Sequence, residues 1–190
     1  MRQVEVRRWT RHEYERMAES GILAPDERVE LLDGEIIRVT PQGARHARAI
    51  RAAEEALRAA FQHGYDVRVQ LPLALHLFSE PEPDLSVVPG SWRDYDTDHP
   101  QSPVLVVEVA DATLAFDRDD KASLYARAGV ADYWIVNLPD RRLEVYRDPA
   151  PETAARHGWA YQSVQHFHAG EPVSPVALPE ARVSVDDLLA

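Results

Sequence analysis

The stretch Pro103-Val-Leu-Val-Val-Glu-Val-Ala110 constrains the fold of this chain more than any other segment. Four valines and one leucine, with no breaker after Pro103, indicate a strand that is covered on both faces at the middle of a sheet. Side chains alternate along a strand, so Glu108 shares a face with Val106 and Ala110. A carboxylate there destabilises the fold by several kcal/mol unless a cation, a metal ion or a good donor meets it. We therefore predict a central strand that carries a functional acid.

The composition narrows the class of protein. A chain of 190 residues with 45% hydrophobic residues predicts one globular domain over 1–190. No run approaches the roughly 20 apolar residues of a membrane span, and cysteine is absent, so we expect a cytoplasmic protein with no membrane partner. The formal net charge of −11 argues against loose coating of nucleic acid by a basic surface. It allows an enzyme whose acids gather at one site while arginines line a groove.

Hydrophobic periodicity and turn signals place the other elements. Asp33-Gly34 between two apolar runs predicts a β-hairpin. Strand, helix and strand from 103 to 138 form a crossover unit, so we expect an α/β or α+β domain with a mixed β-sheet flanked by helices. Helices are predicted over 11–20, 44–62, 117–128 and 185–189, and further strands over 65–77, 85–88, 131–138, 143–146 and 159–167.

Asp84, Glu108 and Lys121 are the strongest candidates for chemistry. Two acids at the ends of adjacent strands suit a hard divalent cation such as Mg²⁺. Lys121 is the single lysine among 21 basic residues, and a lysine pKa shifts more readily than that of arginine. It shares a helix face with Leu124 and Tyr125, which are expected to pack on the sheet and carry Lys121 towards the acids. Taken singly, each of these residues is explained more simply by a structural ion pair, or, for Lys121, by a lysine that snorkels past the edge of the sheet. Taken together, the three favour a catalytic site.

These residues belong to an ordered series that resembles the PD-(D/E)XK nuclease superfamily and, more narrowly, the Uma family of proposed restriction endonucleases. The sequence match covers about residues 9–147. The matching segments are Glu30-Leu-Leu-Asp-Gly-Glu35, Pro41 with His46, Glu80-Pro-Glu-Pro-Asp-Leu85, Val107-Glu-Val109, Thr113 to Lys121, and Tyr125-Ala-Arg-Ala-Gly-Val-Ala-Asp-Tyr-Trp-Ile-Val136. The resemblance implies a restriction-endonuclease-like fold and an endonuclease acting on nucleic acid, most simply DNA. We expect a homodimer, so that two sites can face two strands. One departure is that Ala110 stands where the superfamily's Glu-X-Lys places a lysine, and the resemblance implies that Lys121 replaces it from the helix.

A catalytic arrangement follows as a hypothesis. Asp84, Glu108 and the backbone carbonyl of Val109 would hold one Mg²⁺, or alternatively Mn²⁺, which would activate a water. Lys121 would orient or deprotonate that water, or neutralise charge on the phosphorane. Glu30 is a candidate third acid, helped mainly by the resemblance, and reads equally as a solvated strand residue. His46 reads more simply as a buried, hydrogen-bonded histidine than as a contact to phosphate or water.

Other polar residues carry weaker predictions. Gln70 is assigned a minor supporting role, and Asp117 is interpreted as a helix cap rather than a ligand. Three late histidines lack the spacing of a zinc site: His157, His166 and His168. Trp92 and Tyr95, in a long polar loop over 89–102, suit either base stacking or a dimer contact.

Two functions from different classes remain open. The first is an Mg²⁺-dependent endodeoxyribonuclease, which the two acids and the single lysine favour. The second is a non-catalytic dimeric binding or assembly module that retains the nuclease fold, which the charge of −11 favours because DNA must approach an acidic protein. We expect the first. No zinc finger or helix-turn-helix that would read bases is visible.

Overall fold

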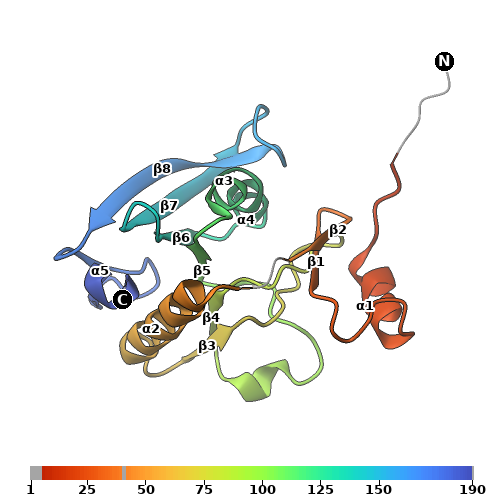
Figure 1. Cartoon of the computed structure of the whole chain (residues 1–190), viewed down its shortest axis with the longest axis horizontal. Coiled ribbons are helices and arrows are strands. Elements are labelled where there is room, and N and C mark those ends of the chain that lie inside the picture. The colour runs from red at the N-terminus through yellow and green to blue at the C-terminus, as the bar shows by residue number, and fades with distance from the viewer. Residues whose placement is uncertain (1–5, 40–41, 190) are drawn as a thin grey trace.

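A computed structural model describes residues 6–39 and 42–189, and a six-stranded mixed sheet forms its centre (Figure 1). The strand order is β3-β4-β5-β6-β7-β8. Within this sheet β5 and β6 run parallel, and the other neighbouring pairs are antiparallel. The predicted mixed sheet is therefore confirmed. The strands are β3 (Tyr65–Val69), β4 (Leu85–Pro89), β5 (Leu105–Ala110), β6 (Asp132–Asn137), β7 (Arg142–Pro151) and β8 (Trp159–His168).

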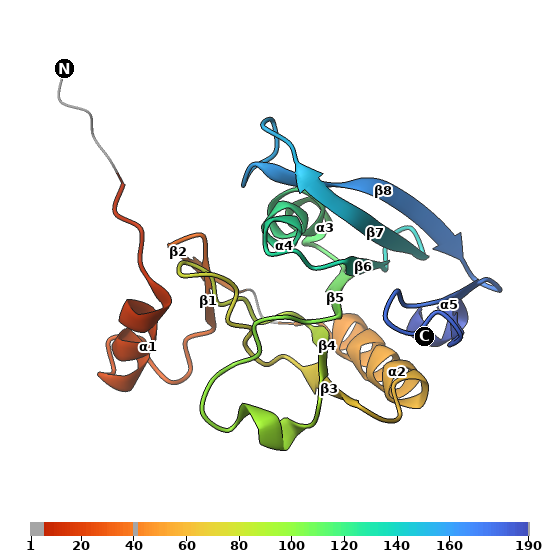
Figure 2. The same cartoon turned by 180° about the vertical axis from the view of Figure 1, so that it is seen from behind.

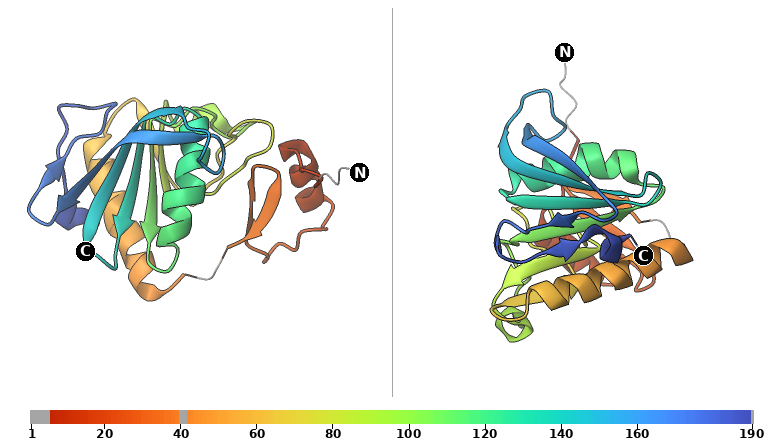
Figure 3. Two further views of the ribbon diagram at one scale, coloured as in Figure 1. Left: turned by 90° about the horizontal axis from the view of Figure 1, so that it is seen from above. Right: turned by 90° about the vertical axis from the view of Figure 1, so that its left-hand side faces the viewer.

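Helices cover both faces of the sheet (Figure 3). On one face lie α2 (Ala44–Ala60) and the short α5 (Val185–Leu188). On the other lies a continuous helical run: α3 (Leu114–Phe116), the π-helical turn η2 (Asp117–Lys121) and α4 (Ala122–Arg127). None of the helices within the described ranges combines the length and the apolar composition needed to cross a bilayer.

The strand β5 has the predicted central place. All six of its residues are buried. Val107 and Val109 pack in the cluster formed with α2, whereas Val106 and Ala110 pack in the cluster formed with α4. Glu108 therefore points to the α4 side, as the alternation predicted, and it meets the helical run there.

The N-terminal elements lie at one end of the sheet (Figure 2). Helix α1 (Arg11–Glu19) has a capping box at Thr10, and the hairpin of β1 (Val29–Leu32) and β2 (Glu35–Arg38) turns at Asp33-Gly34. Both turn residues have positive φ, +51° and +86°, as the two-residue hairpin turn requires. Backbone hydrogen bonds between Leu31 and Glu80 tie the hairpin to the segment that precedes β4. Two short strands, β9 (Pro172–Val173) and β10 (Val183–Ser184), pair near the C-terminal end.

Three predicted elements have other bounds in the structure. The predicted strand over 65–77 ends at Val69, because Gln70 has a φ of +49° and the following segment buries Leu73 and Leu75 without joining the ladder. The helix expected from Asp117 begins at Leu114 instead. The strand expected over 143–146 continues to Pro151, paired with β8. Pro41, one of the residues that carry the family resemblance, lies outside the described residues.

Candidate active site

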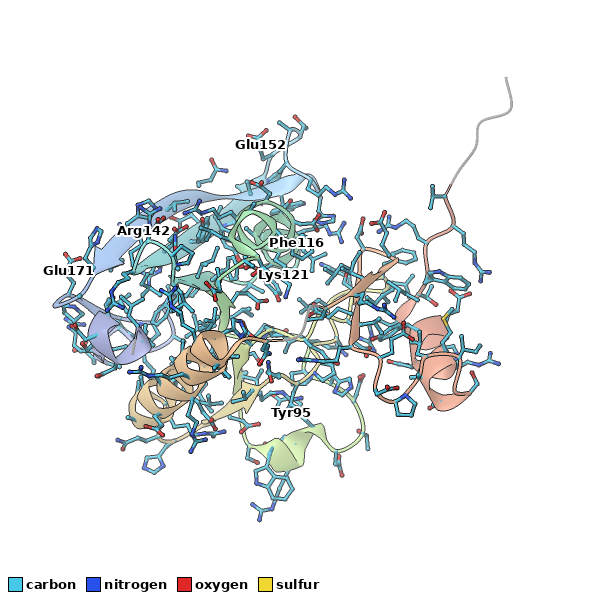
Figure 4. The ribbon with its side chains drawn as sticks, viewed as in Figure 1. Tyr95, Phe116, Lys121, Arg142, Glu152 and Glu171 are labelled. Atoms are coloured by element: carbon cyan, nitrogen blue, oxygen red, sulfur yellow. The ribbon has the colours of Figure 1, made fainter. Side chains whose placement is uncertain are left out.

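One cleft of about 350 Å³ brings together residues from the β1–β2 hairpin, the start of α2, the strand ends and the helical run. Figure 4 shows Lys121 and Phe116 on the side of the helical run that faces the middle of the molecule. All five side chains that the sequence indicated for catalysis line the cleft: Glu30, His46, Asp84, Glu108 and Lys121. Residues that are far apart in the chain are therefore neighbours in space.

Glu108 enters the cleft from β5, and two side chains of the helical run hold its carboxylate. Nζ of Lys121 donates to Oε1 at 2.9 Å, and the hydroxyl of Tyr125 donates to the same oxygen at 2.7 Å. Tyr125 was expected only to pack on the sheet, so its hydrogen bond is a site contact that the sequence reasoning missed. Its position four residues after Lys121 was the available signal, because residues i and i+4 share a helix face.

Asp84 stands immediately before β4, and its carboxylate is held from three directions. The backbone N–H of Val109 donates to Oδ2 at 2.8 Å, and Nε2 of His46 lies 3.1 Å from the same oxygen. Gln70 donates to Oδ1 at a longer 3.4 Å. Burial lowers the pKa of His46, but hydrogen bonds with Asp84 and the Val109 backbone outweigh burial and raise that pKa above its ordinary value. His46 and Gln70 thus orient this acid.

Two further acids approach the ammonium group of Lys121. Glu30 is buried rather than solvated, and its Oε2 lies 3.4 Å from Nζ. Asp117 is also buried, and it accepts a hydrogen bond of 2.6 Å from the hydroxyl of Thr113. The interpretation of Asp117 as a helix cap is wrong, because Thr113 precedes the first helical residue and Asp117 opens the π-helical turn. Asp117 and Lys121 are four residues apart on the helical run, a spacing that puts both on one face, and both line the cleft.

The cleft carries more negative than positive charge. Six carboxylates and three cations (Arg28, Arg38 and Lys121) line it, so its formal charge is −3 with His46 neutral. Burial raises the pKa of Glu108 above its ordinary value, against the opposing effect of Lys121. Burial by itself lowers the pKa of Lys121, but the surrounding carboxylates, Glu108 first, bring it above its ordinary value. Lys121 is therefore protonated at neutral pH, and the acids still outnumber the cations.

The family model of Uma2, described as "Putative restriction endonuclease", matches residues 11–186. The chain belongs to the Uma2 family. Among solved structures, it is similar to the crystal structure of "a putative nuclease belonging to DUF820" from Anabaena variabilis ATCC 29413. That likeness has a TM-score of 0.61 at 18% sequence identity, covers 85% of this chain and 89% of the other, and shows a shared fold. The curated proteins include no match.

The donor set of this Uma2-family chain fits a hard cation better than a soft one. Among the described residues, no group of three or more His, Cys, Asp or Glu side chains is arranged to hold a metal ion by itself. A cation between Asp84 and Glu108 would therefore need backbone carbonyl and water ligands as well, which Mg²⁺ accepts. Glu30 supports the fit, because its buried Oε2 has an ion-pair contact with Lys121 but no hydrogen-bond partner among the described residues. The excess of carboxylates in the cleft gives a divalent ion a favourable environment.

The remaining sequence candidates lie outside the cleft. His157 is half-buried between Asp120 and Asp33, at 2.9 Å and 3.5 Å. His166 and His168 are exposed on β8, so the three late histidines do not gather. In the 89–102 loop, neither Trp92 nor Tyr95 lines the cleft. The guanidinium of Arg68 lies over the ring of Tyr95. Trp92 is 65% exposed and is accessible to a partner.

Proposed function

We propose that this Uma2-family chain is an Mg²⁺-dependent endonuclease that hydrolyses phosphodiester bonds of DNA. The observation that carries the proposal is the meeting of two carboxylates and one ammonium group, those of Asp84, Glu108 and Lys121, in one cleft. This combination suits the hydrolysis of a charged diester, because carboxylates hold a cation and an ammonium group stabilises added negative charge. The description of the family supports the same assignment.

Asp84, Glu108 and the backbone carbonyl of Val109 would hold one Mg²⁺ or Mn²⁺. When bound, the metal supplies a water of lowered pKa and offsets charge on the scissile phosphate. Lys121 remains protonated beside Glu108, so its part is to stabilise the charge that develops on the phosphoryl oxygens rather than to remove a proton. Glu30 also contacts this ammonium group, at 3.4 Å, and would help to keep it in place.

Neighbouring side chains orient the two metal-holding carboxylates. Tyr125 and Lys121 both donate to Oε1 of Glu108, whereas Oε2 has only a longer contact of 3.3 Å from the backbone N–H of Asp84. Oε2 of Glu108 is therefore the oxygen that can turn to a cation with the smaller loss of hydrogen bonding. His46 and Gln70 restrict the carboxylate of Asp84 in the same way.

A plasmid-nicking assay tests the proposal. Purified parent protein should nick supercoiled DNA with Mg²⁺ and not with EDTA, and both Lys121→Ala and Glu108→Gln should reduce the rate at least about 100-fold. Glu54→Gln is the matched control, because Glu54 lies on α2 outside the cleft, and this variant should nick like the parent. Circular dichroism checks that each variant is folded. Nicking that persists in Lys121→Ala at the parent rate would show a contaminating enzyme and remove the assignment.

The charge of −11 favours a second candidate, a non-catalytic binding or assembly module that retains the fold. Metal-dependent nicking by the parent, lost in Glu108→Gln, excludes this alternative. We also propose that the nuclease acts as a homodimer, because two sites are needed to cut two strands together. Light scattering on the purified protein measures the mass of the assembly directly, and a monomer at assay concentration would contradict the dimer.

A further inference from the structure

A second hollow, of about 630 Å³, lies beside the start of α2 and is separate from the cleft described above. Three arginines converge on it from two parts of the chain. Arg45 and Arg48 come from the first turns of α2, and Arg141 comes from the turn between β6 and β7, where it has a φ of +51°. The full lining is Ala44, Arg45, Arg48, Arg141, Asp186 and Leu189.

The helix α2 joins this hollow to the candidate active site. Gly43 and His46 line the cleft of the acids, whereas the residues between and after them, Ala44, Arg45 and Arg48, line the second hollow. Arg45 connects the two directly, since Nη1 lies 3.8 Å from Oδ1 of Asp111, which lines the cleft. A polymer that crosses the start of α2 would therefore contact both.

Arg45 is paired with Asp111, but the other two arginines of this hollow are not neutralised by neighbouring acids. Within residues 6–39 and 42–189, neither Arg48 nor Arg141 has a carboxylate within ion-pair distance, and both side chains are exposed. Arginines further along the same helix behave differently: Arg51 and Arg58 both pair with Glu54, each at 2.9 Å.

The one acid of the hollow, Asp186, is already engaged. Its Oδ2 accepts a hydrogen bond of 2.6 Å from the backbone N–H of Gly170. Three guanidinium groups against one carboxylate leave a formal charge of +2 in this hollow, in a chain whose net charge is −11. Such a local concentration of arginine is the usual arrangement for phosphate, which accepts two parallel N–H donors from a guanidinium group.

We propose that Arg48 and Arg141, with Arg45, bind a backbone phosphate of the nucleic-acid substrate away from the scissile bond. The inference rests on the proposed function for the identity of the ligand, and it extends that function by assigning the path of the polymer across the start of α2. It also explains how an acidic protein holds a polyanion: the attraction is local, at one arginine hollow beside the cleft, and the rest of the surface repels.

Binding is measured without cleavage, by fluorescence anisotropy of a short labelled DNA duplex in Ca²⁺ between about 50 and 200 mM salt. Each phosphate contact that is lost lowers the slope of log affinity against log salt by about 0.9. The double variant Arg48→Ala with Arg141→Ala should lower that slope by about 1 to 2 and weaken binding at least about tenfold at the lowest salt. The matched control, Arg51→Ala with Arg58→Ala, removes the same amount of charge from α2 outside the hollow and should leave the slope unchanged.

Three outcomes are decisive. A double variant with the parent slope and affinity overturns the phosphate site, even if the parent still nicks plasmid. A parent that shows no DNA binding at any salt concentration overturns it as well. A parent that binds DNA with the expected difference between the two double variants, but does not nick plasmid, supports the arginine site and contradicts only the catalytic proposal.

Discussion

Nζ of Lys121 lies 2.9 Å from Oε1 of Glu108, where the π-helical turn meets the central strand. Both side chains are buried, so each is the main compensation for the charge of the other. Removing one member of such a pair leaves an uncompensated charge in the interior, which destabilises a protein by about 3–5 kcal/mol. Variants of this pair therefore need a folding check beside every activity measurement.

Metal binding should depend on Glu108. Isothermal titration with Mg²⁺ or Mn²⁺ should show at least about tenfold weaker binding to Glu108→Gln than to the parent, because one of two carboxylate ligands becomes a neutral amide. Glu54→Gln, an acid outside the cleft, should bind like the parent. Equal binding by all three proteins would remove Glu108 from the metal site.

Tyr125 should act as a positioning residue. Tyr125→Phe removes the 2.7 Å hydrogen bond to Glu108, so we expect nicking to slow about tenfold and the Mg²⁺ concentration for half-maximal rate to rise. The matched control is Tyr161→Phe, which removes a 2.8 Å bond to the Val130 carbonyl away from the cleft. Both changes should lower the free energy of unfolding by about 1 kcal/mol. An unchanged metal dependence in Tyr125→Phe would leave this tyrosine a purely structural role.

The hairpin that carries Glu30 should be sensitive at Gly34. A Cβ at this position would lie 2.5 Å from Cβ of Arg8, whereas a Cβ at Gly21 would meet nothing within 4 Å. Both glycines have positive φ, so alanine at either position destabilises by about 1–2 kcal/mol through the backbone alone. Thermal unfolding should therefore show a clearly larger loss for Gly34→Ala than for Gly21→Ala. Equal losses would mean that the N-terminal segment moves aside freely.

Acid should unfold the protein partly through Glu144. This carboxylate is buried in β7, and burial alone raises its pKa, but four donors lower that pKa to about 2, below the 4.5 of an ordinary glutamate: Arg118, Asn137, Arg142 and Tyr146. A pKa that is lower in the folded state stabilises the fold above about pH 4.5, and this contribution disappears as the pH falls towards 2.

Urea unfolding between about pH 7 and pH 2.5 measures this contribution. Glu144→Gln should be less stable than the parent at neutral pH and should lose less of its remaining stability on acidification, because an amide does not titrate. Glu19→Gln, at the exposed end of α1, should follow the parent curve. A Glu144→Gln variant with the full acid sensitivity of the parent would contradict the assignment.

Local patterns were sufficient where the determining interactions are local. The run around Glu108 indicated a central strand. This strand, β5, is third in the order of the six-stranded sheet, and all of its own residues are buried. Asp33-Gly34 indicated the hairpin, since the turn depends on the backbone freedom of two adjacent residues. The apolar pattern over 65–77 misled, because the segment after Gln70 leaves the ladder and packs irregularly: Leu73 and Leu75 are buried, whereas Leu71 and Leu77 are exposed.

Sequence alone therefore determined the central strand, the hairpin, the two acids at adjacent strand ends and the unusual single lysine, because each depends on residue type and spacing along the chain. Only the tertiary structure decided that Asp117 is a buried acid rather than a cap, that Tyr125 donates to Glu108, and that Arg48 and Arg141 share a hollow. These features depend on distances between elements that are far apart in the chain. No spacing within a single segment of the chain records them.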